Sequence, residues 1–238
     1  MRTPLVVMLA AGALATAAIA AATAPAAVVT PAGAPAPMVC PDPMPPTTHV
    51  AAATRDDPDS PASVLGQKAP DWTFTRWVRG EPMSLASLRG KVVLVRWWTE
   101  DCHFCRATLP EIEMLRKRYG ADGFVTVCVF HPKPPHDVSN LHILEVAAKL
   151  GYDGPIAFDR DWVTLGRYWL DGHPERNWTS VSFLIDRDGK IVWVHGGGEY
   201  HHSTDPRHAR CDAQARELEA QLDRMFGRGA PAAVSATP

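Results

Sequence analysis

The sequence contains two cysteines, Cys102 and Cys105, separated by His103 and Phe104. Two thiols at this spacing can close into a disulfide when they lie at one end of a helix, so the pair can act as a reversible two-electron switch. The N–H groups at a helix N-terminus favour the thiolate, and a protonated His103 would add to that effect. We therefore expect Cys102 to attack a partner's disulfide and Cys105 to resolve the mixed disulfide.

Other uses of the pair stay open from the motif alone. Two such cysteines can be buried structural residues, and a CxxC motif is also half of many zinc sites. The sequence holds 5 cysteines and no second pair at a suitable spacing. This spacing favours redox chemistry over a zinc site built from two cysteine pairs.

Composition restricts the classes of protein and partner. The 238 residues carry a formal net charge of −2, which gives no electrostatic case for binding nucleic acid or an anionic membrane surface. The 22 prolines are unevenly spread and the hydrophobic content is 46%, so one folded domain with disordered flanks fits better than two domains. We expect a monomer.

The N-terminus has the features of an export signal. Arg2 gives a positive start, residues 5–22 are apolar or small, and residues 22–24 fit a small-x-small cleavage pattern. Residues 1–24 are therefore predicted to be a signal peptide or, if uncleaved, a membrane anchor. Either outcome places the domain outside the cytoplasm, in the periplasm or secreted, where a dithiol needs an external source of electrons.

The remaining chain divides by composition. Residues 25–61 are mostly Pro, Ala and Thr, which predicts a disordered linker, and Cys40 within it is interpreted as an exposed thiol without a role. Residues 62–227 are predicted to form the folded domain. Residues 228–238 are predicted to be a disordered tail.

The hydrophobic pattern of the domain's first half predicts alternating strands and helices. Residues 91–98 contain an apolar run suited to a covered central strand, which carries the chain to Cys102. The other elements expected are an edge strand at 69–74, a short helix at 83–88 ended by Gly90, a helix at 103–119 kinked by Pro110 and ended by Gly120, a strand at 124–130, and a helix at 137–150 with Asp137 as N-cap. This order implies right-handed crossovers and a parallel pair of strands.

The second half follows a different pattern. Residues 151–180 are irregular, with a short helix expected at 162–169. Strands at 181–186 and 190–195 are separated by a tight turn, so they predict an antiparallel hairpin, and a helix is expected at 205–226. Together these elements predict an α/β fold: a mixed central sheet flanked by helices, with an N-terminal strand and helix extension and an insertion before the last hairpin.

This order, with the CxxC at the start of the first long helix, resembles the thioredoxin-like fold. Residues 90–98, 102–110, 183–191 and 197–200 resemble the TlpA/ResA group of extracytoplasmic thiol-disulfide oxidoreductases and the redoxin domains of the DipZ type, over about residues 64–226. The resemblance implies the same roles for Cys102 and Cys105, a Trp98 that packs beside the disulfide, and no bound cofactor. It also implies a disulfide reductase of exported, disulfide-containing proteins, supplied by a membrane thiol-reductant donor of the DsbD or CcdA type.

The chain departs from the family pattern at several positions. Asp101 replaces a tryptophan before Cys102, and a carboxylate there opposes thiolate formation. Thr108 stands where many relatives carry a glutamate that accepts a proton, and His131 is a candidate substitute.

Ser180 replaces the family's cis-proline, and we expect the peptide bond before Ser180 to be trans or its loop to be rearranged. The residues between the cysteines, His103 and Phe104, influence the redox potential without revealing it.

A metal site is the competing hypothesis. Histidine and thiolate are good ligands for copper or zinc, and five such residues crowd into a short stretch: His195, His201, His202, His208 and Cys211. His201, His202, His208 and Cys211 are the candidate ligands of a copper- or zinc-binding metallochaperone on the same fold. A polar loop leading into the last helix explains the same residues, and Cys211 can instead pair with Cys40.

A peroxide-reducing peroxiredoxin is a weaker alternative. It shares the fold, but its reactive cysteine normally follows a proline and a threonine in a fixed pattern. Residues 97–102 contain no proline and lack that spacing.

Overall fold

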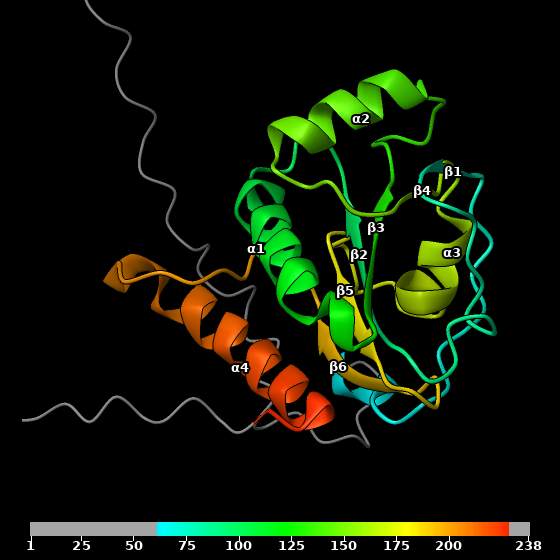
Figure 1. Ribbon diagram of the computed structural model, residues 1–238. Coiled ribbons are helices and arrows are strands. Elements are labelled where there is room, and N and C mark those ends of the chain that lie inside the picture. The colour runs from blue at the N-terminus through cyan, green and yellow to red at the C-terminus, as the bar shows by residue number, and fades with distance from the viewer. Residues whose placement is uncertain (1–60, 229–238) are drawn as a thin grey trace, which may run out of the picture. The chain divides into compact units, whose positions relative to one another are not determined.

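The computed structural model describes residues 61–228, which form a mixed six-stranded sheet with the strand order β1-β4-β3-β2-β5-β6 (Figure 1). The strands are β1 Arg76–Arg79, β2 Val92–Trp98, β3 Phe124–Phe130, β4 Ile156–Phe158, β5 Ser182–Ile185 and β6 Ile191–His195. β2, β3 and β4 run parallel, whereas β1, β5 and β6 pair antiparallel with their neighbours. The predicted α/β class, the parallel pair and the terminal hairpin are confirmed.

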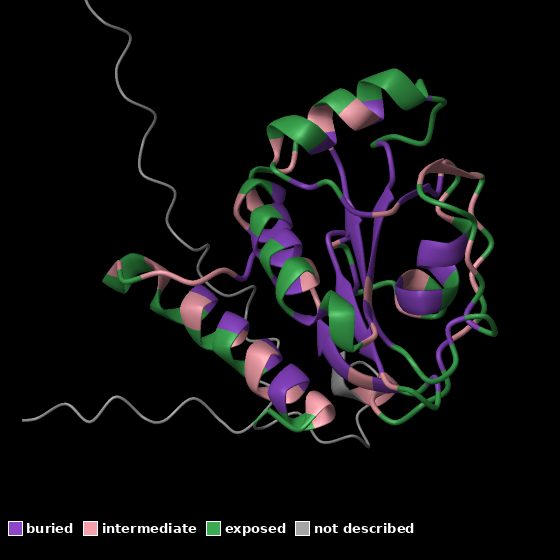
Figure 2. Cartoon of the chain, viewed as in Figure 1, coloured by how far each residue is buried: buried purple, intermediate pink, exposed green. Residues whose placement is uncertain are grey.

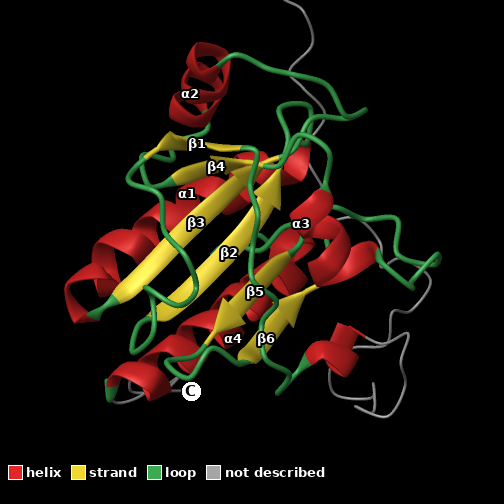
Figure 3. Ribbon diagram, turned by 90° about the vertical axis from the view of Figure 1, so that its right-hand side faces the viewer, coloured by secondary structure: helices red, strands yellow, loops and turns green. Residues whose placement is uncertain are grey.

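Helices cover both faces of the sheet. They are α1 His103–Tyr119, α2 Asn140–Lys149, α3 Val163–Leu165 and α4 Ala209–Phe226. The two ribbon views place α1 and α4 on one face and α3 on the other (Figures 1 and 3). Among residues 61–228, none of these helices combines the length and the apolar character that spanning a bilayer would require.

Alternate residues of β2 face two separate cores. Leu94 and Trp98 pack in the core formed with α1, α2 and α4, whereas Val95 and Trp97 pack in the core formed with α3. Every residue of β2 is buried, and the strands stand out as the buried centre of the fold in Figure 2. A strand that is apolar on both faces is stable only when both faces are covered, so the predicted central strand is confirmed.

The N-terminal extension differs from the prediction at its strand. Residues 69–74 contain no strand, and the edge strand is instead Arg76–Arg79, which pairs with β4. Pro70 has no backbone N–H to donate to a ladder. The indole N–H of Trp72 donates to the carbonyl oxygen of Met83 at 2.7 Å, which holds this extended segment by a side chain instead.

The short helix expected at 83–88 is also wrong. The segment forms turns, in which the side chains of Ser84 and Ser87 each accept the other's backbone N–H at 3.1 Å. Serine hydroxyls that bond nearby backbone groups compete with helical hydrogen bonds. Gly90, at a φ of 81°, ends the segment as expected, because left-handed backbone favours glycine.

α1 covers the predicted range and includes Pro110. Gly120, expected to end it, keeps a right-handed φ of −58°, and a 3₁₀ turn over Gly120–Asp122 follows. The chain reverses at Gly123, whose φ of 94° lies in the left-handed region. The left-handed glycine that ends the helical backbone is therefore Gly123 and not Gly120 as predicted.

α2 begins later than predicted. Its N-cap is Ser139, whose hydroxyl accepts a backbone N–H of the first turn at 3.2 Å. Asp137, the expected cap, instead forms an ion pair with Arg76 of β1 at 3.0 Å. The Asp137 carboxylate, which the sequence pattern placed at the N-terminus of the helix, therefore pairs with a residue of another element.

The irregular stretch contains one strand that the sequence pattern missed. β4 is only 3 residues long and lies between β1 and β3. The expected short helix is present as α3, continued by a π-helical turn over Gly166–Leu170. The predicted signal or anchor and Cys40 lie outside the described residues, as do nearly all of the predicted linker and tail.

Candidate active site

β2 carries the chain to the thiol pair. Trp98 ends the strand, and Cys102 is the N-cap of α1, which begins at His103. Cys102 is partly exposed, whereas Cys105 is fully buried, and both are free thiols. The structure therefore holds the dithiol state, with Cys102 at the helix end where unsatisfied N–H groups favour negative charge.

The two thiols have opposite acidities. The pKa of the Cys102 thiol falls to about 5, chiefly because the Cys105 side chain hydrogen-bonds to the Cys102 thiolate. The Ser180 hydroxyl, the Arg96 charge and the Cys105 backbone N–H lower this pKa further, whereas burial raises it. Burial, followed by the same Cys102–Cys105 hydrogen bond, raises the pKa of the Cys105 thiol well above its ordinary value. At neutral pH, Cys102 is therefore a thiolate and Cys105 the thiol that donates to it.

Ser180 brings a hydroxyl to both sulfurs. Its Oγ lies 3.2 Å from the Cys102 Sγ and 3.7 Å from the Cys105 Sγ. Among residues 61–228 the cis peptide bond is Lys133–Pro134, so the Thr179–Ser180 bond is trans, as expected for a residue other than proline. The hydroxyl can donate to whichever sulfur carries the negative charge.

Trp98 and His131 hold the end of β2 next to this loop. Trp98 and Cys105 belong to the same core, and Cys102 packs against it. The Nδ1 of His131 donates to the Trp98 carbonyl oxygen at 2.9 Å, and its Nε2 accepts from the Thr179 hydroxyl at 2.7 Å. Burial lowers the pKa of His131 to about 3, so the ring is neutral. Both ring nitrogens of His131 are therefore engaged in this structure, and its expected role as proton acceptor stays a prediction.

Comparison with known protein families decides the assignment. The redoxin family model matches residues 65–210. The chain belongs to the redoxin family. This redoxin is 31% identical over 137 residues to protein DipZ of Mycobacterium tuberculosis, a match that covers 56% of the chain and 19% of DipZ. It is 27% identical over 128 residues to the thiol-disulfide oxidoreductase ResA of Bacillus anthracis, which covers 54% of the chain and 67% of ResA.

A solved structure confirms the thioredoxin-like fold of this redoxin. The structure of a thiol:disulfide interchange protein, DsbE, from Chlorobium tepidum matches with a TM-score of 0.52 and 26% identity, and covers 68% of this chain and 98% of that one. The resemblance inferred from the motifs is therefore confirmed. The match to DipZ spans about a fifth of that longer protein, so its whole activity does not transfer by similarity.

Arg96 is a site residue that the sequence analysis missed. It lies in β2 with no exposed surface, and its guanidinium donates to the Ser182 hydroxyl at 3.3 Å and to the Gly198 carbonyl oxygen at 2.9 Å. Its charge lowers the pKa of Cys102. A single charged residue inside an otherwise apolar strand was the available signal, because a buried charge is rare unless other groups compensate it.

The remaining predicted residues of the redoxin site lie around the thiols. The ring of His103 lies 4.0 Å from that of Phe104, and Phe104 packs against Trp178 at 5.6 Å, centroid to centroid. Asp101 is exposed, so solvent screens its charge, and the pKa of Cys102 is low despite it.

The buried Thr108 hydroxyl accepts the backbone N–H of Tyr200 at 3.3 Å, and this hydrogen bond holds the loop after β6 against α1.

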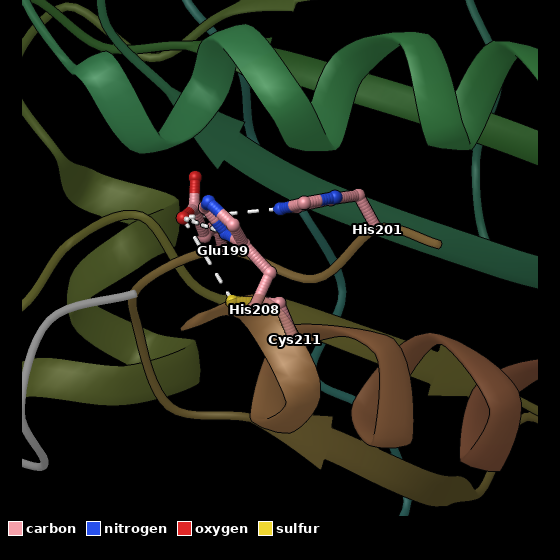
Figure 4. Close-up of side chains that lie close together, drawn as sticks. All are labelled: Glu199, His201, His208 and Cys211. Carbon is pink, nitrogen blue, oxygen red and sulfur yellow. Dashed lines mark hydrogen bonds and ion pairs between the residues drawn. The ribbon is translucent and has the colours of Figure 1, made fainter. Parts of the chain in front are cut away.

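The structure divides the predicted metal ligands into separate groups. His201, His208 and Cys211 gather around Glu199, a residue that the sequence analysis did not include (Figure 4). His202 instead faces acidic side chains, with its Nε2 3.0 Å from a Glu219 oxygen. His195 is buried apart from the cluster, with its Nε2 3.3 Å from the Gln214 side-chain oxygen. The four-residue set that included His202 is not brought together.

Cys211 is disulfide-bonded. It therefore offers no thiolate in this state, which weakens the sequence-based metal set further. Cys40, the pairing partner left open by the sequence, lies outside the described residues. The Glu199 carboxyl is buried, and burial raises its pKa; the charges of His201 and His208 act in the opposite direction.

Proposed function

We propose that this redoxin is a thiol-disulfide oxidoreductase that works outside the cytoplasm as a disulfide reductase of exported proteins. The asymmetry of the thiol pair carries the proposal: a partly exposed Cys102 with a pKa of about 5 beside a buried Cys105 with a raised pKa. The name of one relative, the thiol-disulfide oxidoreductase ResA, supports the same chemistry.

The chemistry follows from that asymmetry. The Cys102 thiolate attacks one sulfur of a substrate disulfide, the substrate's S–S bond breaks, and its departing thiolate takes up a proton. Cys105 then loses its proton and attacks the Cys102 sulfur of the mixed disulfide, and the second substrate thiolate leaves and takes up a proton. The substrate gains two electrons and two protons, and the Cys102–Cys105 pair becomes a disulfide. Ser180, within reach of both sulfurs, can donate to each thiolate in turn.

The reductase direction requires a strong electron donor. A fall in the Cys102 pKa from 9.0 to about 5 stabilises the dithiol form by about 2.7 kcal/mol at pH 7. This makes the pair about 60 mV less reducing than the same pair with ordinary acidity. A membrane donor of lower potential, of the DsbD or CcdA type, would restore the dithiol after each turnover.

Reduction of insulin disulfides by the purified protein, with dithiothreitol as donor, tests the proposal. Cys102→Ser should abolish the activity above the background of the donor, because the attacking thiolate is gone. Cys128→Ala is the matched control, since Cys128 is a free but buried thiol whose pKa burial raises to about 12. Equal activity of wild type and Cys102→Ser would refute the assignment.

A further inference from the structure

We propose that Glu199, His201 and His208 form a binding site for a divalent metal ion of the zinc class. Glu199 and His201 lie in the loop after β6, and His208 immediately precedes α4 (Figure 4). Their candidate ligand atoms, together with the sulfur of Cys211, all lie within 4.8 Å of one another. Two imidazoles and a carboxylate are ligands that zinc accepts, and they leave a fourth position open.

The separations between these atoms suit a shared ion better than direct hydrogen bonds. The Glu199 Oε1 lies 3.9 Å from the His201 Nε2 and 3.7 Å from the His208 Nδ1. Both distances exceed the range of a good N–H···O hydrogen bond. Two ligand atoms each about 2.1 Å from a tetrahedral ion are about 3.4 Å apart, so these two separations would need to shorten by only a few tenths of an ångström.

Each of these three side chains also has an atom that lacks a hydrogen-bond partner. Among residues 61–228, the Glu199 Oε2, the His201 Nε2 and the His208 Nδ1 are buried atoms without one. The Glu199 side chain is only 2% exposed, so solvent does not compensate its carboxylate. Buried polar atoms left unpaired are costly, and a bound ion would satisfy these three side chains together.

The orientation of His201 supports a metal ligand. Its Nδ1 lies 3.1 Å from the carbonyl oxygen of His202, and because a carbonyl only accepts, the proton must sit on Nδ1. The Nε2 of His201 is the other ring nitrogen, and it faces the Glu199 carboxyl without a hydrogen-bond partner, as a metal ligand atom would. A backbone carbonyl that fixes the tautomer in this way is the usual support of a metal-bound histidine.

The site does not depend on a Cys211 thiolate. The Cys211 sulfur lies 3.8 Å from the Glu199 Oε1, but it is committed to a disulfide. The proposal therefore applies to the oxidised protein, in which closing the Cys102–Cys105 pair also removes that pair as a metal ligand. A test in the oxidised state separates this site from any metal bound by the CxxC motif.

Zinc titration of the oxidised full chain, without a histidine tag and in competition with a chromogenic chelator, tests the proposal. We expect a single Zn²⁺ per chain. Glu199→Gln, His201→Ala and His208→Ala should each weaken binding by at least about tenfold, because each removes one of three protein ligands. His202→Ala is the matched control and should bind as the wild type does, because His202 faces Glu219 instead.

Thermal unfolding with and without Zn²⁺ gives a second readout that does not depend on the chelator. Zinc that binds only the folded state should raise the melting temperature of the wild type and of His202→Ala, and it should raise that of the near-isosteric Glu199→Gln by clearly less at the same zinc concentration. Absence of zinc binding by the oxidised wild type would overturn the proposal. So would binding that survives all three ligand substitutions or that is lost in His202→Ala.

Discussion

Replacing Ser180 by alanine should raise the pKa of Cys102 by about one unit. The Ser180 Oγ lies 3.2 Å from the Cys102 Sγ, so the variant loses a hydrogen bond to the thiolate. Hydrogen bonds to charged groups contribute about 1.5–3 kcal/mol, and because Cys102 is partly exposed we take a value near the lower end. One pKa unit corresponds to about 1.4 kcal/mol. The pKa should therefore move from about 5 to about 6.

The rate of alkylation by iodoacetamide as a function of pH measures this shift, because only the thiolate reacts. At pH 5 about half of the wild-type Cys102 is thiolate, against about one in eleven molecules of Ser180→Ala, so the variant should react about fivefold more slowly. At pH 8 both proteins are fully ionised and should react at similar rates. The sign is fixed, because a lost stabilising contact can only move the thiolate pKa toward its ordinary value.

Thr179→Val is the matched control for disturbance of the same loop. Its hydroxyl hydrogen-bonds to the His131 Nε2 at 2.7 Å, with no sulfur among its partners, so the Cys102 profile should stay within about 0.3 units of wild type. Ser180→Thr keeps a hydroxyl and should restore most of the effect. A Ser180→Ala profile that overlays the wild type would show that Ser180 does not stabilise the thiolate.

Other substitutions test the buried charge, the resolving step and the core. Arg96→Met should raise the Cys102 pKa by less than Ser180→Ala does, because the Arg96 charge contributes less than the Ser180 hydrogen bond; alkylation profiles compare the two. Cys105→Ser should accumulate a mixed disulfide between Cys102 and substrate, which non-reducing electrophoresis detects, and a failure to trap it would contradict the resolving role. Leu94→Ala should lower the free energy of unfolding by about 2–5 kcal/mol in urea, because Leu94 has no exposed surface.

The elements that position the thiols could be predicted because their signals are local. The apolar run of β2 and the helical spacing after Cys105 mark the strand and helix that flank the motif. The glycine-containing turn between β5 and β6 marks the hairpin. Each of these patterns is long or specific enough to exclude the alternatives.

The errors occur where tertiary contacts decide. β4 has only 3 residues, which is too few to show the alternating hydrophobic pattern of a strand. It is recognised as a strand because it pairs with β1 and β3 on either side. Asp137 was expected to cap α2, but Arg76 takes its carboxylate. His202 was grouped with His201 from their adjacency in sequence, although the two rings face different partners. Glu199 was not predicted as a candidate ligand, because its approach to the histidines depends on how the loop after β6 packs.

The pH dependence of the redox potential of the Cys102–Cys105 pair tests the central claim most directly. If Cys102 is a thiolate and Cys105 a thiol at neutral pH, reduction takes up one proton for two electrons, so the potential should fall by about 30 mV per pH unit between about pH 6 and 8. Below about pH 5, where both thiols are protonated, the slope should steepen to about 59 mV per unit. A pair that failed to cycle, or a slope of about 59 mV per unit across the neutral range, would contradict the account.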